Sequence, residues 1–168
     1  MKFHLVDRIE SIEPGKSIVT IKVLSLAEEY LADHFPAFPV LPGVLMLEAL
    51  VQSAAWLVRV QQDFAKSIIV LSAARNVRYA NFVQPGKTLR CELTAMEIGD
   101  SSAKFKGLGS VEGNQAVSAR LELQCFNLAS RQRRLAAADQ AIIDQMRRMF
   151  QLIGGPAALE RGKTGAGG

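Results

Sequence analysis

Alternation of apolar and polar residues marks most of the chain before residue 126 as β-structure. Residues 17–23 alternate roughly and are rich in β-branched side chains, which favour strands. The same texture returns in residues 67–77, 88–98, 103–111 and 115–126. Pro85-Gly86 fits the centre of a type II turn, and Gly113-Asn114 fits a tight hairpin. Strands joined by such turns predict an antiparallel meander.

A single long apolar segment interrupts this pattern. Residues 43–61 contain no proline, have no glycine after Gly43, and are too long for a strand, so they predict a helix. Because nearly every early position of this helix is apolar, we expect the sheet to wrap around it. The fold class predicted is therefore α+β, with five or six antiparallel strands around one central helix. Residues 25–28 (Ser-Leu-Ala-Glu) resemble a capping box that opens a short helix.

The C-terminal part has a different pattern. Apolar residues recur at spacings of seven, four, three and four, as one stripe of an amphipathic helix: Leu135, Ile142, Met146, Met149 and Ile153. Arginines make this helix basic, so it could dock on its own domain, pair with another chain or lie on an anionic membrane. We expect docking on the protein. The predicted organisation is a domain of residues 1–126, a helical extension of 127–153 and a flexible Gly- and Ala-rich tail of 154–168.

The charge distribution argues against nucleic acid binding. Residues 1–126 carry 13 basic and 13 acidic side chains, whereas residues 127–168 carry seven and three, so the net +4 of the 168-residue chain belongs to the extension. The main domain has no basic runs interleaved with aromatics. Charges within the first eight residues do not suit a signal peptide, and prolines, Glu48 and Gln52 interrupt the apolar segment, so we expect a cytoplasmic protein without a membrane span.

No cofactor is expected from the residue patterns. Cys91 and Cys125 lie 34 positions apart without a CxxC partner, and no glycine-rich phosphate motif is present. The two cysteines are interpreted as buried, reduced thiols, and neither a metal nor an organic cofactor is predicted.

The chemistry is concentrated just before and within the long helix. Pro42 suits the first helical position, which leaves the backbone N–H groups of Gly43 and Val44 as free donors at the positive helix end. His34 precedes them in a loop that three prolines bias towards extended backbone. Glu48 lies in an otherwise apolar stretch, where burial without a partner is costly. An imidazole, a carboxylate and free N–H donors can together remove a proton next to a carbonyl and protonate a leaving group.

Each of these residues also has an ordinary structural interpretation. A lone loop histidine is more often a hydrogen-bonding residue than a base, and Glu48 could simply pair with an arginine such as Arg78. Gln52, one turn after Glu48, could orient the Glu48 carboxylate or only line a helix seam.

The combined pattern is far more specific than its parts. The segment His-Phe-Pro-x-x-Pro-Val-x-Pro-Gly-Val-Leu-x-x-Glu-Ala-x-x-Gln, from His34 to Gln52, resembles the active-site signature of the 3-hydroxyacyl-acyl carrier protein dehydratases of the FabZ/FabA type. Residues 5–16 and 82–86 resemble the family's first strand and a later turn. The resemblance covers about residues 3–126.

The resemblance implies a hot-dog fold and a shared active site. Two protomers are expected to pair, alone or as a trimer of dimers, with His34 from one chain and Glu48 from the other at each site. His34 would then remove the C2 proton of a 3-hydroxyacyl thioester, Glu48 would protonate the departing 3-hydroxyl, and the Gly43 N–H would polarise the carbonyl. Glu at position 48 is similar to the FabZ branch, which dehydrates without isomerising.

Two departures from the family pattern concern substrate shape. Ala37 stands where the family usually has glycine and would resist a positive φ, and Phe38 could narrow the acyl tunnel. Substrate-binding residues are accordingly predicted to be Gly43, Val44, Phe38 and Gln52.

The partner implied is acyl carrier protein, an acidic protein. Basic candidates for contacting it are Arg75, Arg78, Lys87 and Arg90, although each could be only a solvated strand charge. Two other functions fit the same fold: a hot-dog thioesterase, which leaves the proline-rich His34 loop unexplained, and a non-catalytic subunit that binds acyl carrier protein, which has no need of Glu48.

Overall fold

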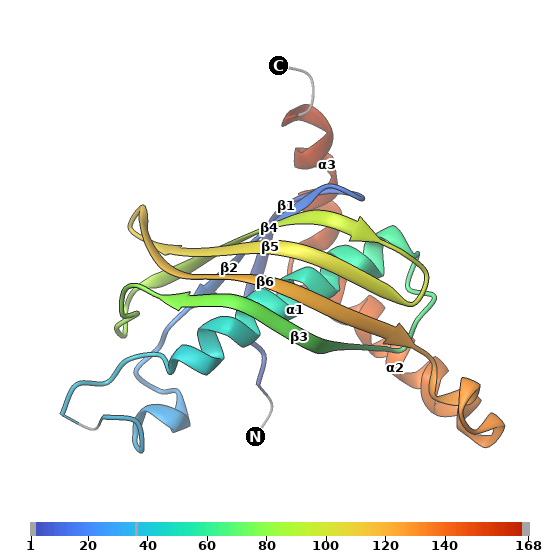
Figure 1. Cartoon of the computed structure of the whole chain (residues 1–168), viewed down its shortest axis with the longest axis horizontal. Helices are drawn as coiled ribbons and strands as arrows, with labels where there is room; N and C mark the ends of the chain where they lie inside the picture. The colour runs from blue at the N-terminus through green and yellow to red at the C-terminus, as the bar shows by residue number, and fades with distance from the viewer. Residues whose placement is uncertain (1–2, 36, 166–168) are drawn as a thin grey trace.

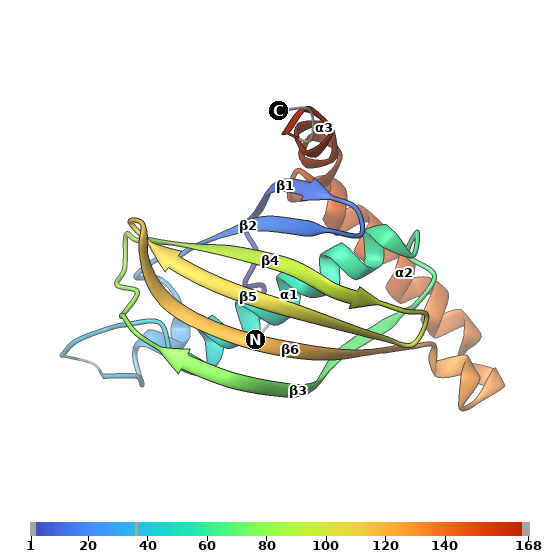
Figure 2. The ribbon, with the colours of Figure 1, turned by 45° about the horizontal axis from the view of Figure 1, so that its top comes forward.

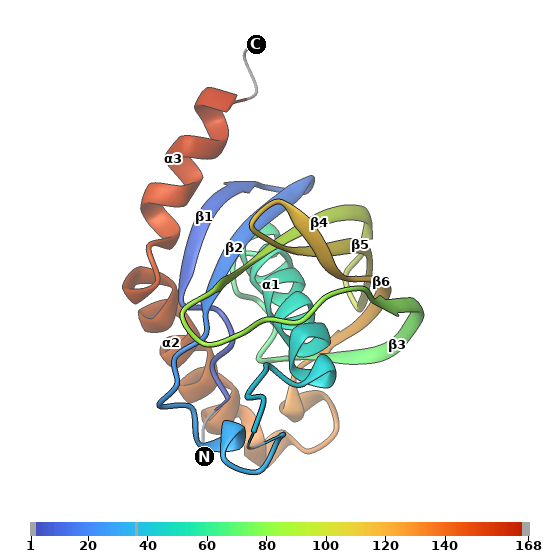
Figure 3. The same ribbon diagram turned by 90° about the vertical axis from the view of Figure 1, so that its left-hand side faces the viewer.

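One antiparallel sheet curves around a central helix in the computed structural model, which describes residues 3–35 and 37–165 (Figures 1 and 3). The strands of this described part are β1 (Arg8–Glu13), β2 (Ser17–Val23), β3 (Ile68–Tyr79), β4 (Thr88–Ile98), β5 (Ser102–Val111) and β6 (Asn114–Phe126). The helices are α1 (Gly43–Gln61), α2 (Ala136–Leu152) and α3 (Gly155–Gly165), with short 3-10 turns η1 (Glu29–Leu31), η2 (Leu128–Ser130) and η3 (Arg133–Leu135). The α+β class and the wrapped helix are confirmed.

The core forms between α1 and the inner face of the sheet. Alternate residues of β4 and β5 point inward and are fully buried, among them Leu93 and Phe105. They pack on α1, whose Leu50 and Leu57 are equally buried. By length and composition α1 could cross a membrane, but 56% of that window is buried inside the protein, as in the core helix of a globular domain.

The strand order differs from the predicted meander. The order is β1-β2-β4-β5-β6-β3, so β3 pairs with β6 at one edge instead of lying beside β4 (Figure 2). The segment after β3 crosses to the end of β2, where Leu24 N–H donates to the Lys87 carbonyl at 3.0 Å and Gly86 N–H donates to the Leu24 carbonyl at 2.8 Å. These bonds direct β4 onto β2.

The predicted turns are close to the observed ones. Gly86 has a φ of 82° and Lys87 N–H bonds to the Gln84 carbonyl, as a type II turn requires. In the β5–β6 hairpin the two central residues are Glu112 and Gly113, both with positive φ, one position before the predicted pair.

The predicted capping box is wrong. Only the 3-10 turn η1 follows Ser25, and the Ser25 hydroxyl accepts a hydrogen bond from Ala27 N–H at 3.2 Å. The Glu28 carboxylate is instead held at 2.6 Å by Nζ of Lys22, a lysine that is itself buried. A buried ammonium needs a carboxylate partner, so Glu28 is not available to cap a helix.

The C-terminal extension docks on the domain, as expected. Helix α2 crosses beside α1 from the β3 edge of the sheet to its β1 edge (Figures 1 and 3). At its first end the buried carboxylate of Asp139 accepts hydrogen bonds from the Ser67 hydroxyl and from the N–H groups of Leu128 and Ala129. At its other end the Ile153 carbonyl accepts a 2.8 Å bond from Ile9 N–H of β1.

Residues 155–165 differ from the predicted flexible tail. They form α3, which packs along β1 with Ala158 buried and the Arg161 guanidinium donating to the Glu10 carbonyl at 2.6 Å. A side chain at Gly162 would clash with the Ile12 carbonyl, so glycine here permits the close approach of α3 to the strand. The small residues therefore serve packing on an edge strand, which composition alone does not reveal. Residues 166–168 of the predicted tail lie outside the described residues.

Docking of α2 is expected to be sensitive to acid. Burial alone would raise the pKa of Asp139, but the hydrogen bonds from Ser67, Ala129 and Leu128 outweigh it and lower the pKa. Because the pKa of Asp139 is lower in the folded state, its ionised carboxylate stabilises the docked helix fully at pH values above the ordinary Asp pKa of about 3.9. This stabilisation is lost as the pH falls through the lowered pKa of the folded state. Asp139→Asn should release α2 at neutral pH as well, because it removes the charge.

Trp56, the only tryptophan of the chain, reports on this docking. Its ring centroid lies 6.0 Å from that of Phe150 in α2, so undocking should shift its fluorescence to the red. Asp144→Asn is the matched control, because this carboxylate lies in the same helix and, among the described residues, accepts its hydrogen bond from Gln140 of that helix. Identical emission of the Asp139→Asn protein and the control from pH 3 to 7 would refute the anchoring role.

Candidate active site

His34 lies in the loop that leads into α1. Its side chain is half-buried, its ring centroid is 4.4 Å from that of Phe35, and no described residue makes a hydrogen bond with the imidazole. Phe35 itself has a φ of 51°, an unusual value for a bulky residue, and its carbonyl accepts a 2.7 Å bond from Phe38 N–H. A positive φ therefore lies at Phe35, where the sequence predicted extended backbone.

The start of α1 supplies free backbone donors. Pro42 has a ψ of 136°, so it is the residue before the helix. The prediction that it is the first helical residue is therefore wrong by one position. Its carbonyl accepts the N–H groups of Leu45 and Met46, whereas within the described part of the chain no acceptor faces the N–H groups of Gly43 and Val44. These two donors lie at the positive end of a 19-residue helix, where a partial negative charge is stabilised.

His34 and Gly43 line the same cavity. Its volume is about 440 Å³ and its other walls are Phe35, Val40, Leu41, Met46, Tyr79, Ala80, Asn81 and Phe82. Sequence reasoning missed Tyr79, which closes one side: a Cβ atom on Gly43 would lie 3.2 Å from the Tyr79 ring. The absence of a side chain at Gly43 is therefore the signal in the sequence that another group packs closely against this position. The cavity joins a free imidazole to a free N–H donor.

Glu48 lines a second cavity of about 210 Å³, on the same helix but further along it. Its carboxylate is half-buried and accepts a 3.0 Å hydrogen bond from Nε2 of Gln52. The same Gln52 nitrogen donates to the Phe3 carbonyl at 3.0 Å, and Oε1 of Gln52 accepts from Leu5 N–H at 2.9 Å. The predicted contact between Gln52 and Glu48 is present, and the N-terminal segment fixes the Gln52 amide.

Within one chain, then, the cavity of His34 does not include Glu48. The imidazole that shares the second cavity with Glu48 is that of His4, from the N-terminal segment. The structure of one chain brings Gly43 to His34 and Gln52 to Glu48, and leaves these two pairs apart.

The other two predicted substrate-binding residues lie at the surface. Val44 is 68% exposed and lines neither cavity. Phe38 also stays outside the His34 cavity, but its ring packs edge-on against that of Phe82, which does line it, at 5.6 Å. Phe38 can therefore affect the shape of the cavity only through Phe82.

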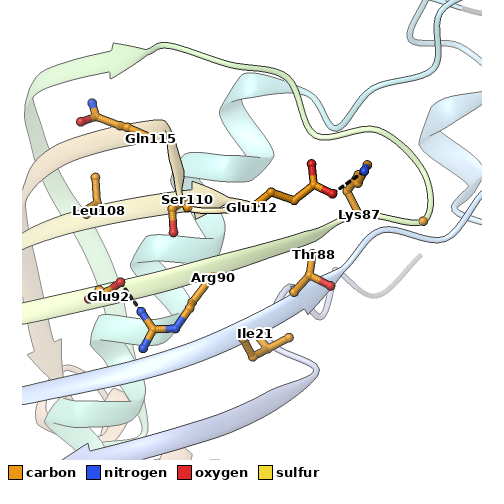
Figure 4. A pocket seen from close by; sticks show the side chains of 11 residues that line it. Ile21, Lys87, Thr88, Arg90, Glu92, Leu108, Ser110, Glu112 and Gln115 are labelled. Carbon is orange, nitrogen blue, oxygen red and sulfur yellow. Dashed lines mark hydrogen bonds and ion pairs between the residues drawn. The ribbon is translucent and has the colours of Figure 1, made fainter.

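Most of the predicted basic residues are already ion-paired. Lys87 pairs with Glu112, and Arg90 pairs with Glu92 two residues along the same strand; all four line a groove on the outer face of the sheet (Figure 4). Arg75 pairs with Glu122 of the neighbouring strand at 3.2 Å. Arg78 is exposed, precedes the cavity residue Tyr79, and forms no ion pair with any described residue. Of the four candidates, Arg78 is thus the one whose charge is not compensated locally.

The cysteines are buried and free. Burial raises the pKa of the Cys91 thiol to about 12, against the opposing effect of hydrogen bonds from Thr20 and Ser53, and burial also raises the pKa of Cys125. Neither is a thiolate at neutral pH. Among the described residues no three His, Cys, Asp or Glu side chains gather into a group that could hold a metal ion.

Removing Gln52 should cost both stability and catalysis. Gln52→Leu leaves Leu5 N–H without its acceptor and Glu48 without its donor, which is expected to lower the free energy of unfolding by about 1–3 kcal/mol. Denaturant unfolding measures this, with the exposed Gln115→Leu as control. If Gln52 also positions Glu48 for the predicted dehydration, the kcat of that reaction should fall by a larger factor than its KM rises. An unchanged kcat would leave Gln52 a purely structural role.

Comparison with known proteins assigns the chain to a family. A family model described as a FabA-like domain matches residues 1–120. The 3-hydroxyacyl-[acyl-carrier-protein] dehydratase FabZ of Janthinobacterium sp. is 40% identical over 124 residues, which are 72% of this chain and 78% of the relative. FabZ of Ruminiclostridium cellulolyticum is 36% identical over 122 residues, covering 71% of this chain and 84% of the relative.

Solved structures show the same fold at low identity. The dehydratase heterocomplex ApeI:P from Xenorhabdus doucetiae matches with a TM-score of 0.63 and 19% identity, over 75% of this chain and 85% of that one. A Q49A mutant of thioesterase PA1618 from Pseudomonas aeruginosa matches with a TM-score of 0.57 and 15% identity, over 72% and 81%. Because both dehydratases and thioesterases share this architecture, the fold does not distinguish them. The signature from His34 to Gln52, the family model and the sequence relatives do, and by them the chain belongs to the FabA-like family, on its FabZ branch.

Proposed function

We propose that this protein removes water from a 3-hydroxyacyl group carried on acyl carrier protein and forms the trans-2-enoyl thioester. The observation that carries the proposal is the cavity lined by both His34 and Gly43 at the helix start; neither the His34 imidazole nor the Gly43 N–H has a hydrogen-bond partner among the described residues. Membership of the FabZ branch supports the same reaction.

The reaction needs one base, one acid and one donor for the carbonyl oxygen. The Gly43 N–H polarises the thioester carbonyl, which makes the C2 proton more acidic. An imidazole nitrogen of His34 accepts that proton as the C2–H bond breaks. The electron pair of the broken C2–H bond forms the C2–C3 double bond. The C3–O bond breaks, and the departing oxygen takes a proton from the Glu48 carboxyl group and leaves as water.

The acid and the base come from opposite protomers in this proposal. His34 and Glu48 line different cavities of one chain, so a single site that holds both requires a second copy. The outer edge of β3 is the natural place to pair: this 12-residue strand ends the sheet and exposes the apolar side chains of Val70, Leu71 and Tyr79. A long apolar edge strand is a template for another strand. The opposite edge, β1, is covered by α3.

Acyl carrier protein is the proposed partner. Arg78, with its uncompensated charge next to Tyr79, would meet the acidic carrier at the mouth of the His34 cavity. The proposed location is the cytoplasm, where such carriers deliver their acyl groups.

The direct test is mass-spectrometric detection of water loss from 3-hydroxyacyl-acyl carrier proteins incubated with the protein. A decrease of one water in the mass of the acyl group is expected, with the thioester intact. Release of the free acid would instead favour a thioesterase. Binding of the carrier without any change in mass would favour a non-catalytic subunit.

A further inference from the structure

The cavity beside Glu48 is built by three separate parts of the chain. The N-terminal segment supplies Phe3, His4 and Val6; helix α1 supplies Glu48, Val51, Gln52, Ala55, Trp56 and Arg59; and Ile69 of β3 completes the near wall. The remaining wall consists of Met146 and Met149 of α2. The matching family model ends at residue 120, so this wall belongs to the extension and not to the common domain.

Helix α2 is held firmly in this position. Asp139 anchors its first turn, and the Ile153 carbonyl ties the other end to β1. Between them the ring of Phe150 packs against Trp56 at 6.0 Å and against Phe64 at 5.6 Å. The Arg147 guanidinium lies 4.7 Å from the Phe64 ring and donates to the Asp63 carbonyl at 2.7 Å. The two methionines are therefore part of a fixed wall.

The chemical character of the cavity changes along α1. Glu48 and Gln52 form a polar end, Val51, Ala55 and Ile69 form an apolar middle, and Arg59 lies at the far end, stacked on Trp56 with 5.3 Å between its guanidinium carbon and the indole centroid. Met146 and Met149 belong to this far end, because the same turns of α2 contact Trp56 and Phe64. From Glu48 to Arg59 the helix rises about 16 Å. A carboxylate at one end of an apolar channel suits an acyl substrate whose reactive carbons lie at Glu48 and whose hydrocarbon tail follows the helix.

We infer that the cavity beside Glu48 is the acyl pocket and that Met146 and Met149 of the C-terminal extension form its closed end, which makes α2 the determinant of acyl chain length. This inference rests on the proposed function. The cavity volume of about 210 Å³ accommodates about seven groups of the size of a water molecule, and a methylene is of similar size. With three carbons at the reacting end, the pocket fits straight, apolar acyl chains of up to about ten carbons.

The test measures turnover on 3-hydroxyacyl-acyl carrier proteins of 4 to 16 carbons, together with the affinity for the matching 3-hydroxyacyl-pantetheines. The wild type should favour chains of up to about ten carbons. The double variant Met146→Ala and Met149→Ala should raise the ratio of 14-carbon to 8-carbon turnover and affinity by at least about tenfold, since each methylene in an apolar pocket counts strongly. Met146→Phe should move the preference towards shorter chains. Met96→Ala, on the exposed surface of β4, should leave the profile unchanged.

The outcomes separate this inference from the proposed function. Turnover with the same chain-length profile in all variants would overturn the role of α2 and leave the dehydratase intact. Absence of turnover on every substrate, with affinities that still shift in the two predicted directions, would support the pocket and overturn the reaction. Opposite shifts for the alanine and phenylalanine variants cannot result from unfolding, which lowers the affinity for all chain lengths alike.

Discussion

His34→Ala is expected to lower the rate of water loss by about 10²–10⁴-fold, the range typical of removing a general base. The imidazole has no hydrogen-bond partner among the described residues, so its removal should leave the fold unchanged. The loss should therefore appear in kcat on a saturating 3-hydroxyacyl-acyl carrier protein, while the midpoint of thermal unfolding stays close to that of the wild type.

His4→Ala is the comparison that shows which of the two histidines is the base. The chain has two histidines, and within one protomer it is His4 that lines the cavity of Glu48. If His4→Ala abolished water loss and His34→Ala did not, the base would belong to the Glu48 cavity of the same chain, and the shared site would be wrong.

Glu48→Gln should reduce water loss to a similar extent, because an amide cannot protonate the departing hydroxyl. The substituted side chain keeps the size of Glu48 and an oxygen that can still accept the hydrogen bond from Gln52. A large fall in kcat with unchanged stability would therefore report the lost proton donor and not a disturbed helix. Full activity of Glu48→Gln on every chain length would exclude this residue as the acid.

Mixing the two inactive variants tests whether the site is shared. In a heterodimer of His34→Ala and Glu48→Gln chains, one of the two sites combines an intact His34 with an intact Glu48. Random exchange of equal amounts makes half of the dimers mixed, so about one quarter of the wild-type activity should return. Native mass spectrometry verifies that heterodimers have formed. If they form without any return of activity, the proposal that His34 and Glu48 of one site come from opposite chains is wrong.

The sequence predicted those features in which local chemistry and tertiary packing agree. The bounds of β2, β4 and α1 matched because alternating β-branched residues suit a half-buried strand, and a long run of Leu, Ala and Val suits a buried helix. The docking of α2 was expected because its apolar stripe has few large side chains and its methionines suit packing on a protein surface. The hydrogen bond between Gln52 and Glu48 followed from their separation of four residues on one helix.

The errors share a physical cause, which is competition from residues far away in the chain. Glu28 is recruited by the buried Lys22, so the expected helix cap never forms. Residues 155–165 look like a linker by composition, yet their small side chains allow a helix to approach β1 closely. Similarly, β3 lies beside β6 because long-range hydrogen bonds direct β4 onto β2.

By itself, the sequence determined the family and the long helix, and it predicted His34 and Glu48 as the reactive pair, since these inferences depend on residue types at short, fixed spacings. Only the tertiary structure decided that His34 lines one cavity with Tyr79 and Gly43, that Glu48 lines another, and that two methionines from the extension line the latter. These relations join segments as far apart in the chain as Phe3 and Met149. They arise when the chain buries its apolar surface, and no local pattern encodes which distant side chains then become neighbours.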